Sequence, residues 1–339
     1  MNATESNSVA RGKTFAVAPM MDWTDRHCRF FHRRLTRHAL LFTEMLTEMA
    51  VRKGDRQKLL GFDPAEQPVA LQLGGSNPTG LAEAARIGED FGYVEINLNV
   101  GCPSDKVQEG RFGACLMAEP GLVAECVSAM QKAVTIPVTV KCRIGIDEQD
   151  DFVDLQNFVQ QVSDAGCKTF TVHARKAWLK GLSPKQNREI PPLNYGRVHQ
   201  LKASFPQLQI MLNGGLASPL DDVSHLHDLD GLMYGREAYH NPWILSLVDP
   251  LTHHVPTPVS TRAQVVEEML TYIHALTKSG LPLHRITRHM LGLYHGQPGG
   301  RIWRQILSTE GCKPGAGTQV LRNALMAVEE QASRKLAAA

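Results

Sequence analysis

The strongest constraint on the fold is an eightfold alternation of short apolar runs with helix-length segments. The runs are rich in β-branched and aromatic residues, as buried strands are. They span residues 15–18, 40–44, 69–73, 93–97, 138–141, 169–173, 210–213 and 231–234. Strands that alternate with helices form parallel βαβ units, and eight such units make a barrel of about 250 residues. We therefore predict an α/β fold, a (β/α)₈ TIM barrel over residues 14–248.

A doubly wound parallel sheet is the alternative fold. It is disfavoured as a dinucleotide-binding domain, because no GxGxxG motif follows any of the predicted strands. Among the intervening helices, one begins at Asn77-Pro78 and runs to residue 90, and another covers residues 151–165.

The rest of the chain divides into three parts. Residues 1–13 are polar, and we expect a disordered lead. Residues 249–260 contain three prolines and are typical of a linker. A small C-terminal helical domain is predicted over residues 261–339. Its first helix begins at a capping box formed by Thr261 and Gln264 and ends near residue 277, and further helical segments follow at residues 285–293, 302–307 and 319–335.

Positive charge is concentrated in that helical domain. The whole chain has a net charge of only +2, but residues 261–335 carry ten Lys and Arg against five Glu. This segment therefore has a net charge of +5, which leaves −3 for the remainder. A basic segment of this kind is typical of a phosphate-binding surface.

Composition also excludes several classes of protein. No apolar stretch approaches the ~20 residues of a membrane span, and the N-terminus lacks the apolar core of a signal peptide. Seven cysteines without a CxxC pair predict free thiols in a reducing cytoplasm. No zinc-type spacing of Cys and His is present, so we predict no metal site. We expect a cytoplasmic monomer without a membrane partner.

Polar residues and glycines follow nearly every predicted strand. Active sites of TIM barrels lie at the carboxyl ends of the strands, so these residues should surround one mouth. In strand order they are Pro19, Met20 and Met21; Gln72; Asn97, Asn99 and Cys102; Lys141 and Arg143; His173 and Arg175; Asn213, Gly214 and Gly215; Gly235 and Arg236.

The glycines after the seventh and eighth strands predict a phosphate site. Loops at this place in barrels often bind phosphate through exposed backbone N–H groups, which glycine lets an anion approach closely. Arg236 adds a charged donor. A planar cofactor anchored there would extend towards Gln72 and Lys141. A lysine beside a flavin would stabilise the negative charge of the reduced ring, and the Gln72 amide would bind its pyrimidine edge.

Taken together, these motifs resemble those of the tRNA-dihydrouridine synthases over nearly the whole chain. The matching segments are APMMDWTD at 18–25, NLNVGCP at 97–103, VKCRIG at 140–145, TVHAR at 171–175, LNGG at 212–215 and MYGR at 233–236. Two further segments, MDWTDRH at 21–27 and AWLKGLSPK at 177–185, are most similar to the DusA subfamily.

The resemblance implies an FMN-dependent reduction of tRNA uridines, with FMN bound non-covalently and NADPH as electron donor. Hydride would pass from the flavin to C6 of uracil, and Cys102 would give the proton to C5. Thiols are mostly protonated at neutral pH, as this step requires. Residues 110–115 would close over the base, which must be extruded from the tRNA. The implied cofactor contacts are Pro19, Met20, Met21, Gln72, Lys141, His173, Asn213, Gly214, Gly215, Gly235 and Arg236.

A second implied set of residues contacts tRNA. Asn99 would hold the uracil, and residues 176–192 form a loop much longer than the usual ~2–6 residues. The expected tRNA contacts are Asn99, Arg143, Arg175, Gln186, Arg188, Glu189, Arg301 and Arg304. Resemblance to the subfamily places the target uridines in the D-loop, at positions 20 and 20a.

Two other functions remain open from the sequence. One is a flavin enzyme acting on a free pyrimidine, similar to dihydroorotate dehydrogenases, although a free base needs no basic helical domain. The other is a tRNA-binding protein with a degenerate site, against which Cys102, Lys141 and His173 all count.

Overall fold

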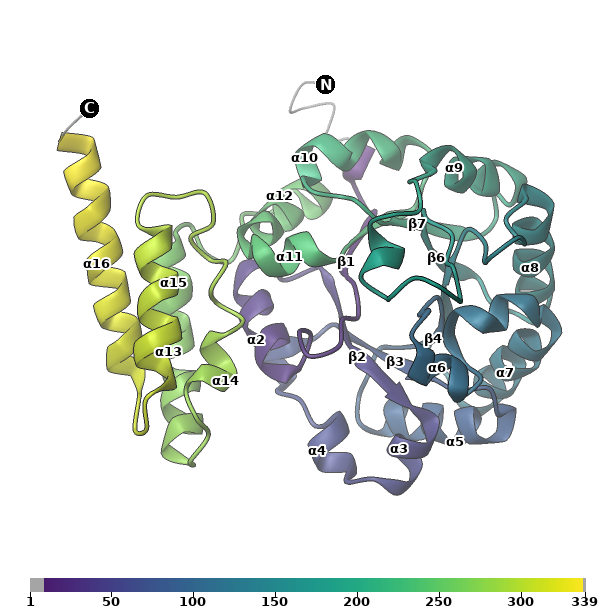
Figure 1. Cartoon of the computed structure of the whole chain (residues 1–339), viewed down its shortest axis with the longest axis horizontal. Helices are drawn as coiled ribbons and strands as arrows, with labels where there is room; N and C mark the ends of the chain where they lie inside the picture. Colours follow the sequence, from purple (N-terminus) through teal and green to yellow (C-terminus); the bar gives the residue numbers. More distant parts are fainter. Residues whose placement is uncertain (1–8, 338–339) are drawn as a thin grey trace.

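Eight parallel strands close into a barrel in the computed structural model, which describes residues 9–337 (Figure 1). Each strand pairs with the next along the chain, and β1 pairs with β8. The strands are β1 (Thr14–Val17), β2 (Leu40–Thr47), β3 (Val69–Gly74), β4 (Glu95–Val100), β5 (Val138–Arg143), β6 (Thr169–His173), β7 (Gln209–Asn213) and β8 (Gly231–Tyr234). The predicted TIM barrel is therefore confirmed.

Helices surround the barrel and continue into a separate bundle at its side (Figure 1). Around the barrel lie α2 (Arg26–Leu35), α3 (Glu48–Lys53), α4 (Arg56–Leu60), α5 (Pro78–Asp90), α6 (Asp105–Glu109), α7 (Pro120–Ala133), α8 (Phe152–Asp164), α9 (Tyr195–Ser204), α10 (Pro219–Asp222), α11 (Arg236–His240) and α12 (Val248–His253). The bundle comprises α13 (Arg262–Lys278), α14 (His284–Thr287), α15 (Gly300–Thr309) and α16 (Thr318–Ala337). Within residues 9–337, no helix is long and apolar enough to span a bilayer.

The interior of the barrel has an apolar side and a polar side. Side chains of a strand alternate between its two faces, so every second residue points inward. The apolar interior cluster consists of Ala16, Ala18, Phe42, Ala70, Met211 and Met233. Buried polar groups instead come from β3 to β7 and include Gln72, Asn97, Asn99, Thr139, Arg143, Thr171 and Asn213.

The fourth strand was predicted two residues too early. It runs from Glu95 to Val100, so Asn99 lies within the strand, as Asn97 does, rather than in a loop after it. Ile96, Leu98 and Val100 join the core between barrel and helices, while the asparagines alternate with them. The polar barrel interior explains the error, because polar residues at every second position resemble the start of a loop.

Both predicted boundaries of the barrel need correction. Residues 9–13 pack onto the barrel: Ala10 is fully buried and the Gly12 N–H donates to the Thr252 carbonyl (3.1 Å). The predicted disorder is thus wrong for this part of the lead, and residues 1–8 lie outside the described chain. Residues 249–253 of the predicted linker belong to α12, where buried Asp249 accepts hydrogen bonds from Thr36 Oγ1 (2.6 Å) and Arg37 N (2.7 Å). A helix tied by a buried carboxylate belongs to the barrel.

The helical domain begins as predicted and then departs from the prediction. Thr261 and Gln264 form the expected capping box at the start of α13. The helix expected over residues 285–293 ends at Thr287, and turns follow up to α15. Gly292 lies in this segment, where a Cβ would stand 2.3 Å from the His240 carbonyl oxygen of the barrel. The backbone of this segment therefore approaches the barrel so closely that position 292 has no room for a side chain.

Paired polar groups lock the helical domain onto α2. Asp25 caps α2 and accepts a hydrogen bond from Arg288 Nη2 (2.8 Å), and its carboxylate lies 3.0 Å from His289 Nε2. Burial by itself would raise the pKa of Asp25. Its hydrogen bonds, of which the one with His289 has the largest effect, instead hold this pKa well below its usual range. Beside this pair, the rings of Phe30 and Tyr272 stack at 3.8 Å. Barrel and helical domain thus meet over a packed, charged junction.

Candidate active site

The predicted residues of β3, β4, β5 and β7 meet at the carboxyl end of the barrel in two hydrogen-bonded groups. In one, Asn99 Nδ2 donates to Gln72 Oε1 at 2.8 Å. In the other, Lys141 Nζ donates to Asn213 Oδ1 at 2.9 Å, and Asn213 Nδ2 donates to the Met233 carbonyl at 2.7 Å. The side chains therefore hold one another in place, which is the preorganisation that catalytic sites need.

Cys102 is a half-buried free thiol on the loop that follows β4. The backbone N–H groups of Gly101 and Cys102 both donate to Asn99 Oδ1, at 3.1 and 3.0 Å. The Cys102 carbonyl in turn accepts a hydrogen bond from Ala114 N (2.9 Å). Gly113 has a φ of +78°, and a Cβ there would stand 2.5 Å from that carbonyl oxygen. The segment predicted to close the site therefore packs directly against the cysteine loop.

Lys141 and His173 lie in a desolvated, positively charged part of the mouth. Burial, helped by the nearby Arg143, lowers the pKa of Lys141 to about 8. Burial also lowers the pKa of His173 well below its usual value, with further contributions from Arg143 and Lys141. The imidazole is therefore neutral, and its buried Nδ1 has no hydrogen-bond partner among the described residues. An unpaired buried nitrogen of this kind marks a position for a ligand.

The turns after β7 and β8 have the conformation that an anion site needs. Gly214 and Gly215 have φ values of +110° and +72°, where other residues are strained. A Cβ on Gly214 would stand 3.1 Å from the His173 ring, so this turn lies against the imidazole. Gly235 has open space where a Cβ would be, and α11 begins at the next residue, Arg236.

These features together fit a flavin mononucleotide. Backbone N–H groups at the Gly214-Gly215 and Gly235 turns suit its phosphate. The ammonium group of Lys141 and the unpaired Nδ1 of His173 supply polar groups at the carboxyl ends of the neighbouring strands β5 and β6. These donors and the open space at Gly235 therefore suit the two chemically different ends of such a cofactor.

Arg236 is an exposed residue that already has a partner. Its Nη1 lies 2.7 Å from Glu189 Oε1 on the long loop that follows β6. The sequence assigned Arg236 to the cofactor phosphate and Glu189 to tRNA, so the structure joins one residue from each predicted set.

Arg143 holds loops together from a buried position. It is only 4% exposed, and its guanidinium donates to the carbonyls of Gly101 (2.8 Å), Lys176 (3.1 Å) and Asn187 (3.1 Å). This geometry differs from the predicted direct contact with tRNA, because a buried guanidinium bound to three carbonyls organises the mouth instead. Arg175 makes fewer hydrogen bonds than Arg143. Its Nη1 donates to the Pro191 carbonyl, and its buried Nε has no partner among the residues that the structure describes.

The loop at residues 176–192 combines one buried anchor with exposed polar groups. Asn187 is fully buried and bonds the backbone of Trp178 from both ends of its amide (2.8 and 2.9 Å). Gln186, Arg188 and Glu189 around it are exposed, as contacts to a large substrate must be. The predicted cofactor residues that follow β1 differ in exposure: Pro19 and Met20 are half-buried, and Met21 is 57% exposed.

Arg301 and Arg304 lie on α15 of the helical domain, away from the strand ends. Both are exposed, while Trp303 between them is fully buried and donates to the Met290 carbonyl (2.9 Å). Their shared exposed face agrees with the predicted spacing. Arg288 does not repeat this arrangement, because it pairs with Asp25 at the domain junction.

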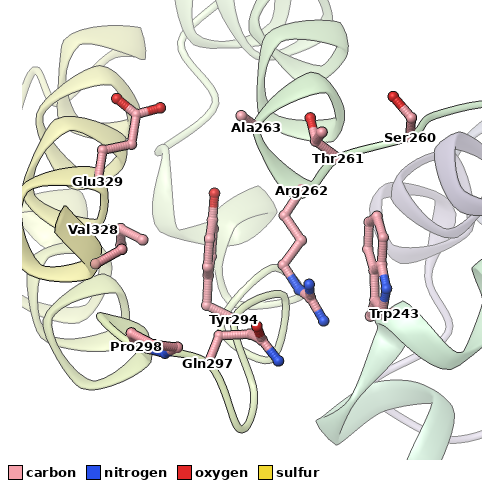
Figure 2. Close-up of a pocket in the computed structure, with 11 residues that line it drawn as sticks. Trp243, Ser260, Thr261, Arg262, Ala263, Tyr294, Gln297, Pro298, Val328 and Glu329 are labelled. Carbon is pink, nitrogen blue, oxygen red and sulfur yellow. The ribbon is translucent and has the colours of Figure 1, made fainter. Parts of the chain in front are cut away.

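A cavity of about 350 Å³ lies between the two domains rather than at the barrel mouth (Figure 2). Arg262 lies over the Trp243 ring at 4.3 Å, and its Nε donates to the Leu293 carbonyl at 2.8 Å. Glu329 of α16 lines the opposite side. The charged groups of this groove are of mixed sign, and Arg262 already binds the junction, so we assign the chemistry to the mouth.

The sequence interpretation missed the polar groups below the mouth. Glu95 and Thr139 lie inside the barrel and are hydrogen-bonded to each other (2.6 Å). Their signal was the strict alternation in β4, where Glu95, Asn97 and Asn99 occupy one face.

Comparisons with known proteins agree with one another. The family model for dihydrouridine synthases, "Dihydrouridine synthase (Dus)", matches residues 16–330. A protein from Synechocystis named tRNA-dihydrouridine(20/20a) synthase is 58% identical over 312 residues, covering 92% of this chain and 93% of its own. A Vibrio cholerae protein of the same name is 55% identical over 317 residues, covering 93% and 97%.

A similar structure supports the fold only. A 2-naphthoyl-CoA reductase complex superposes with a TM-score of 0.52 and 10% sequence identity, over 69% of this chain and 49% of that one.

Proposed function

Because the chain belongs to the dihydrouridine synthase family, we propose that it reduces the C5–C6 double bond of tRNA uridines to 5,6-dihydrouridine. The single observation that carries this proposal is the match over residues 16–330, which includes both the barrel and most of the basic helical domain. An enzyme for a free pyrimidine, the alternative left open by the sequence, has no need of that second domain.

The proposed cofactor is non-covalently bound FMN. Lys141 and His173 would contact the ring system, and the turns at Gly214, Gly215 and Gly235 would bind the phosphate. Gln72 would meet the pyrimidine edge of the cofactor. When bound and reduced by NADPH, FMN would supply the hydride to the uracil ring.

The chain's own residues do the remaining chemistry. The thiol of Cys102 donates the proton that the second carbon of the double bond needs, so that one hydride and one proton are added. Asn99 fixes the loop of Cys102 through two backbone hydrogen bonds and holds the extruded uracil within reach. Neutral His173 accepts or donates a hydrogen bond without adding charge.

The cofactor can be tested directly on the purified protein. We expect a yellow protein that releases FMN, identified by chromatography, on denaturation. With NADPH and an unmodified tRNA transcript it should form dihydrouridine, and without tRNA it should only reduce its flavin. A colourless protein that cannot be reconstituted with FMN would contradict the cofactor assignment.

We further propose positions 20 and 20a of the D-loop as the targets, as the names of the relatives state for those proteins. The exposed groups Gln186, Arg188 and Glu189 near the mouth are suited to orient tRNA by contacts with backbone and base edges. Mapping dihydrouridine by reverse-transcription stops in a deletion strain tests this. Loss at another D-loop position alone would refute the positions and leave the enzyme class intact.

A further inference from the structure

A chain of side-chain hydrogen bonds leads from the Cys102 loop into the barrel. At its upper end, the N–H groups of Gly101 and Cys102 donate to Asn99 Oδ1 at 3.1 and 3.0 Å. Asn99 Nδ2 then donates to Gln72 Oε1 at 2.8 Å. Asn99 is 8% exposed and Gln72 only 1%, so the chain passes at once from the mouth into the interior.

The same chain of hydrogen bonds continues downwards and ends at the carboxyl group of Glu95. Gln72 Nε2 donates to Asn97 Oδ1 at 2.8 Å, and Asn97 Nδ2 donates to Thr139 Oγ1 at 2.8 Å. The Thr139 hydroxyl donates to Glu95 Oε1 at 2.6 Å. Asn97 is fully buried and Thr139 is 3% exposed, so water has little access to this part of the chain.

The direction of every bond follows from the two ends. Backbone N–H groups can only donate, so Asn99 must turn its oxygen to the Cys102 loop and its nitrogen to Gln72. Each amide then has its oxygen above and its nitrogen below, down to Asn97. The Thr139 oxygen accepts from Asn97, so its one proton needs an acceptor, and Glu95 supplies it.

We propose that Glu95 is a positioning residue, which acts through Thr139, Asn97 and Gln72 to fix the amide of Asn99 and with it the loop of Cys102. This inference rests on the proposed function, because the loop matters there as the source of a proton. Glu95 itself lies at the start of β4, at the opposite end of the strand from the mouth. Its side chain is hydrogen-bonded to Thr139 and not to the cysteine or to the predicted cofactor residues of β5 to β8.

The hydrogen-bond chain also determines which polar group of Asn99 is available to a ligand at the mouth. A side-chain amide has two N–H donors, and only one of those of Asn99 is bonded to Gln72. The group left for a ligand is therefore a donor, which suits the carbonyl oxygens of uracil. If the amide were free to turn, the same position would offer an acceptor in part of the molecules and lose this selectivity.

The hydrogen-bond chain is separate from the second hydrogen-bonded group at the mouth, which contains Lys141 and Asn213. Lys141 bonds Asn213, which bonds the Met233 carbonyl, and within residues 9–337 no side-chain hydrogen bond joins these residues to Asn99 or Gln72. Interruption of the chain should therefore act on the cysteine loop more than on the phosphate end of the cofactor site.

Thr139→Val is the variant that interrupts the chain, and Thr171→Val is its matched control. Both threonines are 3% exposed and lie inside the barrel on neighbouring strands, but the Thr171 hydroxyl is directed to Met211 Sδ (3.8 Å). In the full-length protein, hydrogen–deuterium exchange of the Gly101 and Cys102 amides reports on the loop. Oxidation of the reduced flavin by saturating tRNA in a single turnover reports on the proton donor.

For Thr139→Val we expect amide exchange at Gly101 and Cys102 to accelerate up to about tenfold, because their shared acceptor loosens. Flavin oxidation by tRNA should slow roughly 10- to 100-fold, the cost of a small misplacement, with KM for tRNA nearly unchanged. Thr171→Val should change neither quantity more than about twofold. Equal losses in the two variants, or unchanged exchange in Thr139→Val, would overturn the proposal.

A pair of substitutions at Glu95 provides the second test. Glu95→Gln retains an acceptor oxygen for the Thr139 hydroxyl, whereas Glu95→Leu removes it at similar size. We expect Gln to restore most of the exchange protection and turnover lost with Leu, and equal defects would refute the role of Glu95 as acceptor. The exchange measurement needs no tRNA, so it decides the hydrogen-bond chain even if the wild-type protein makes no dihydrouridine.

Discussion

The barrel mouth and the exposed face of the helical domain hold polar groups in opposite ways. At the mouth, Asn99, Lys141 and Asn213 are hydrogen-bonded to other side chains. On α15, Arg301 and Arg304 are exposed and have no ion-pair partner among the described residues. Fixed, desolvated groups suit a reaction that needs one geometry, whereas exposed cations suit attraction of a polyanion.

This difference predicts that the mouth controls rate and the helical domain controls affinity. The two kinds of measurement can therefore be separated by substitution. The largest effects should come from the mouth, where a missing group cannot be replaced by water.

Cys102→Ala should show the largest effect, a loss of turnover of about 10²–10⁴-fold from removal of the proton donor. Binding of FMN and tRNA should stay near the wild-type values, and NADPH should still reduce the flavin, since that half-reaction does not use the thiol. The control is Cys312→Ala, an exposed free thiol of the helical domain, which should leave turnover near the wild-type value. Near-normal dihydrouridine formation by Cys102→Ala would make that cysteine structural.

Lys141→Met should slow flavin reduction roughly 10- to 100-fold, the usual worth of a hydrogen bond from a charged donor. Because the pKa of Lys141 is lowered to about 8, the ammonium form dominates at pH 7 and disappears as the pH rises through 8. Wild-type flavin reduction should therefore fall above about pH 8, and this limb should be absent from the variant.

Lys202→Met is the control for that pH limb, because Lys202 pairs with Asp230 (2.7 Å), which precedes β8 at the other end of the barrel. It should leave the profile of flavin reduction intact. A pH limb that persists in Lys141→Met would mean that another group titrates.

Replacing Arg301 and Arg304 together with Ala should weaken tRNA binding about tenfold at low salt. The salt dependence of the affinity should become shallower by about one unit of log–log slope for each phosphate that the variant no longer neutralises. Lys313→Ala on the same domain is the control, since Lys313 already pairs with Glu310 (2.5 Å). FMN content should not change. An unaltered salt slope would move the tRNA surface to the barrel, where Arg175 and Arg188 are the next cations to replace.

Glu189→Gln should have the smallest effect on the flavin. The Glu189–Arg236 pair is exposed, with side chains 44% and 42% accessible, so its removal should alter FMN affinity and flavin reduction by less than about threefold. The choice or efficiency of uridine reduction should change more, because Glu189 lies on the loop expected to meet tRNA. A large drop in FMN affinity would instead show that Glu189 holds Arg236 in place for the phosphate.

Local patterns in the amino-acid sequence were sufficient to predict the barrel and the position of Cys102 after its fourth strand. Alternation of apolar runs with helical segments predicted eight strands, and the capping box at Thr261 located the first helix of the second domain. Motifs placed Cys102 after β4 and glycines after β7 and β8. Each of these signals lies within a few residues of chain, where spacing and backbone preference are sufficient.

The pairing of polar groups, by contrast, became visible only in the folded chain. Arg143 is a buried anchor of loops, and Arg288 is a partner of Asp25, because residues more than 30 positions apart supply their acceptors. The orientation of Asn99 likewise depends on Gln72, Asn97 and distant Thr139 in the closed barrel. Hydrogen bonds across strands depend on register and barrel closure, which no local spacing contains.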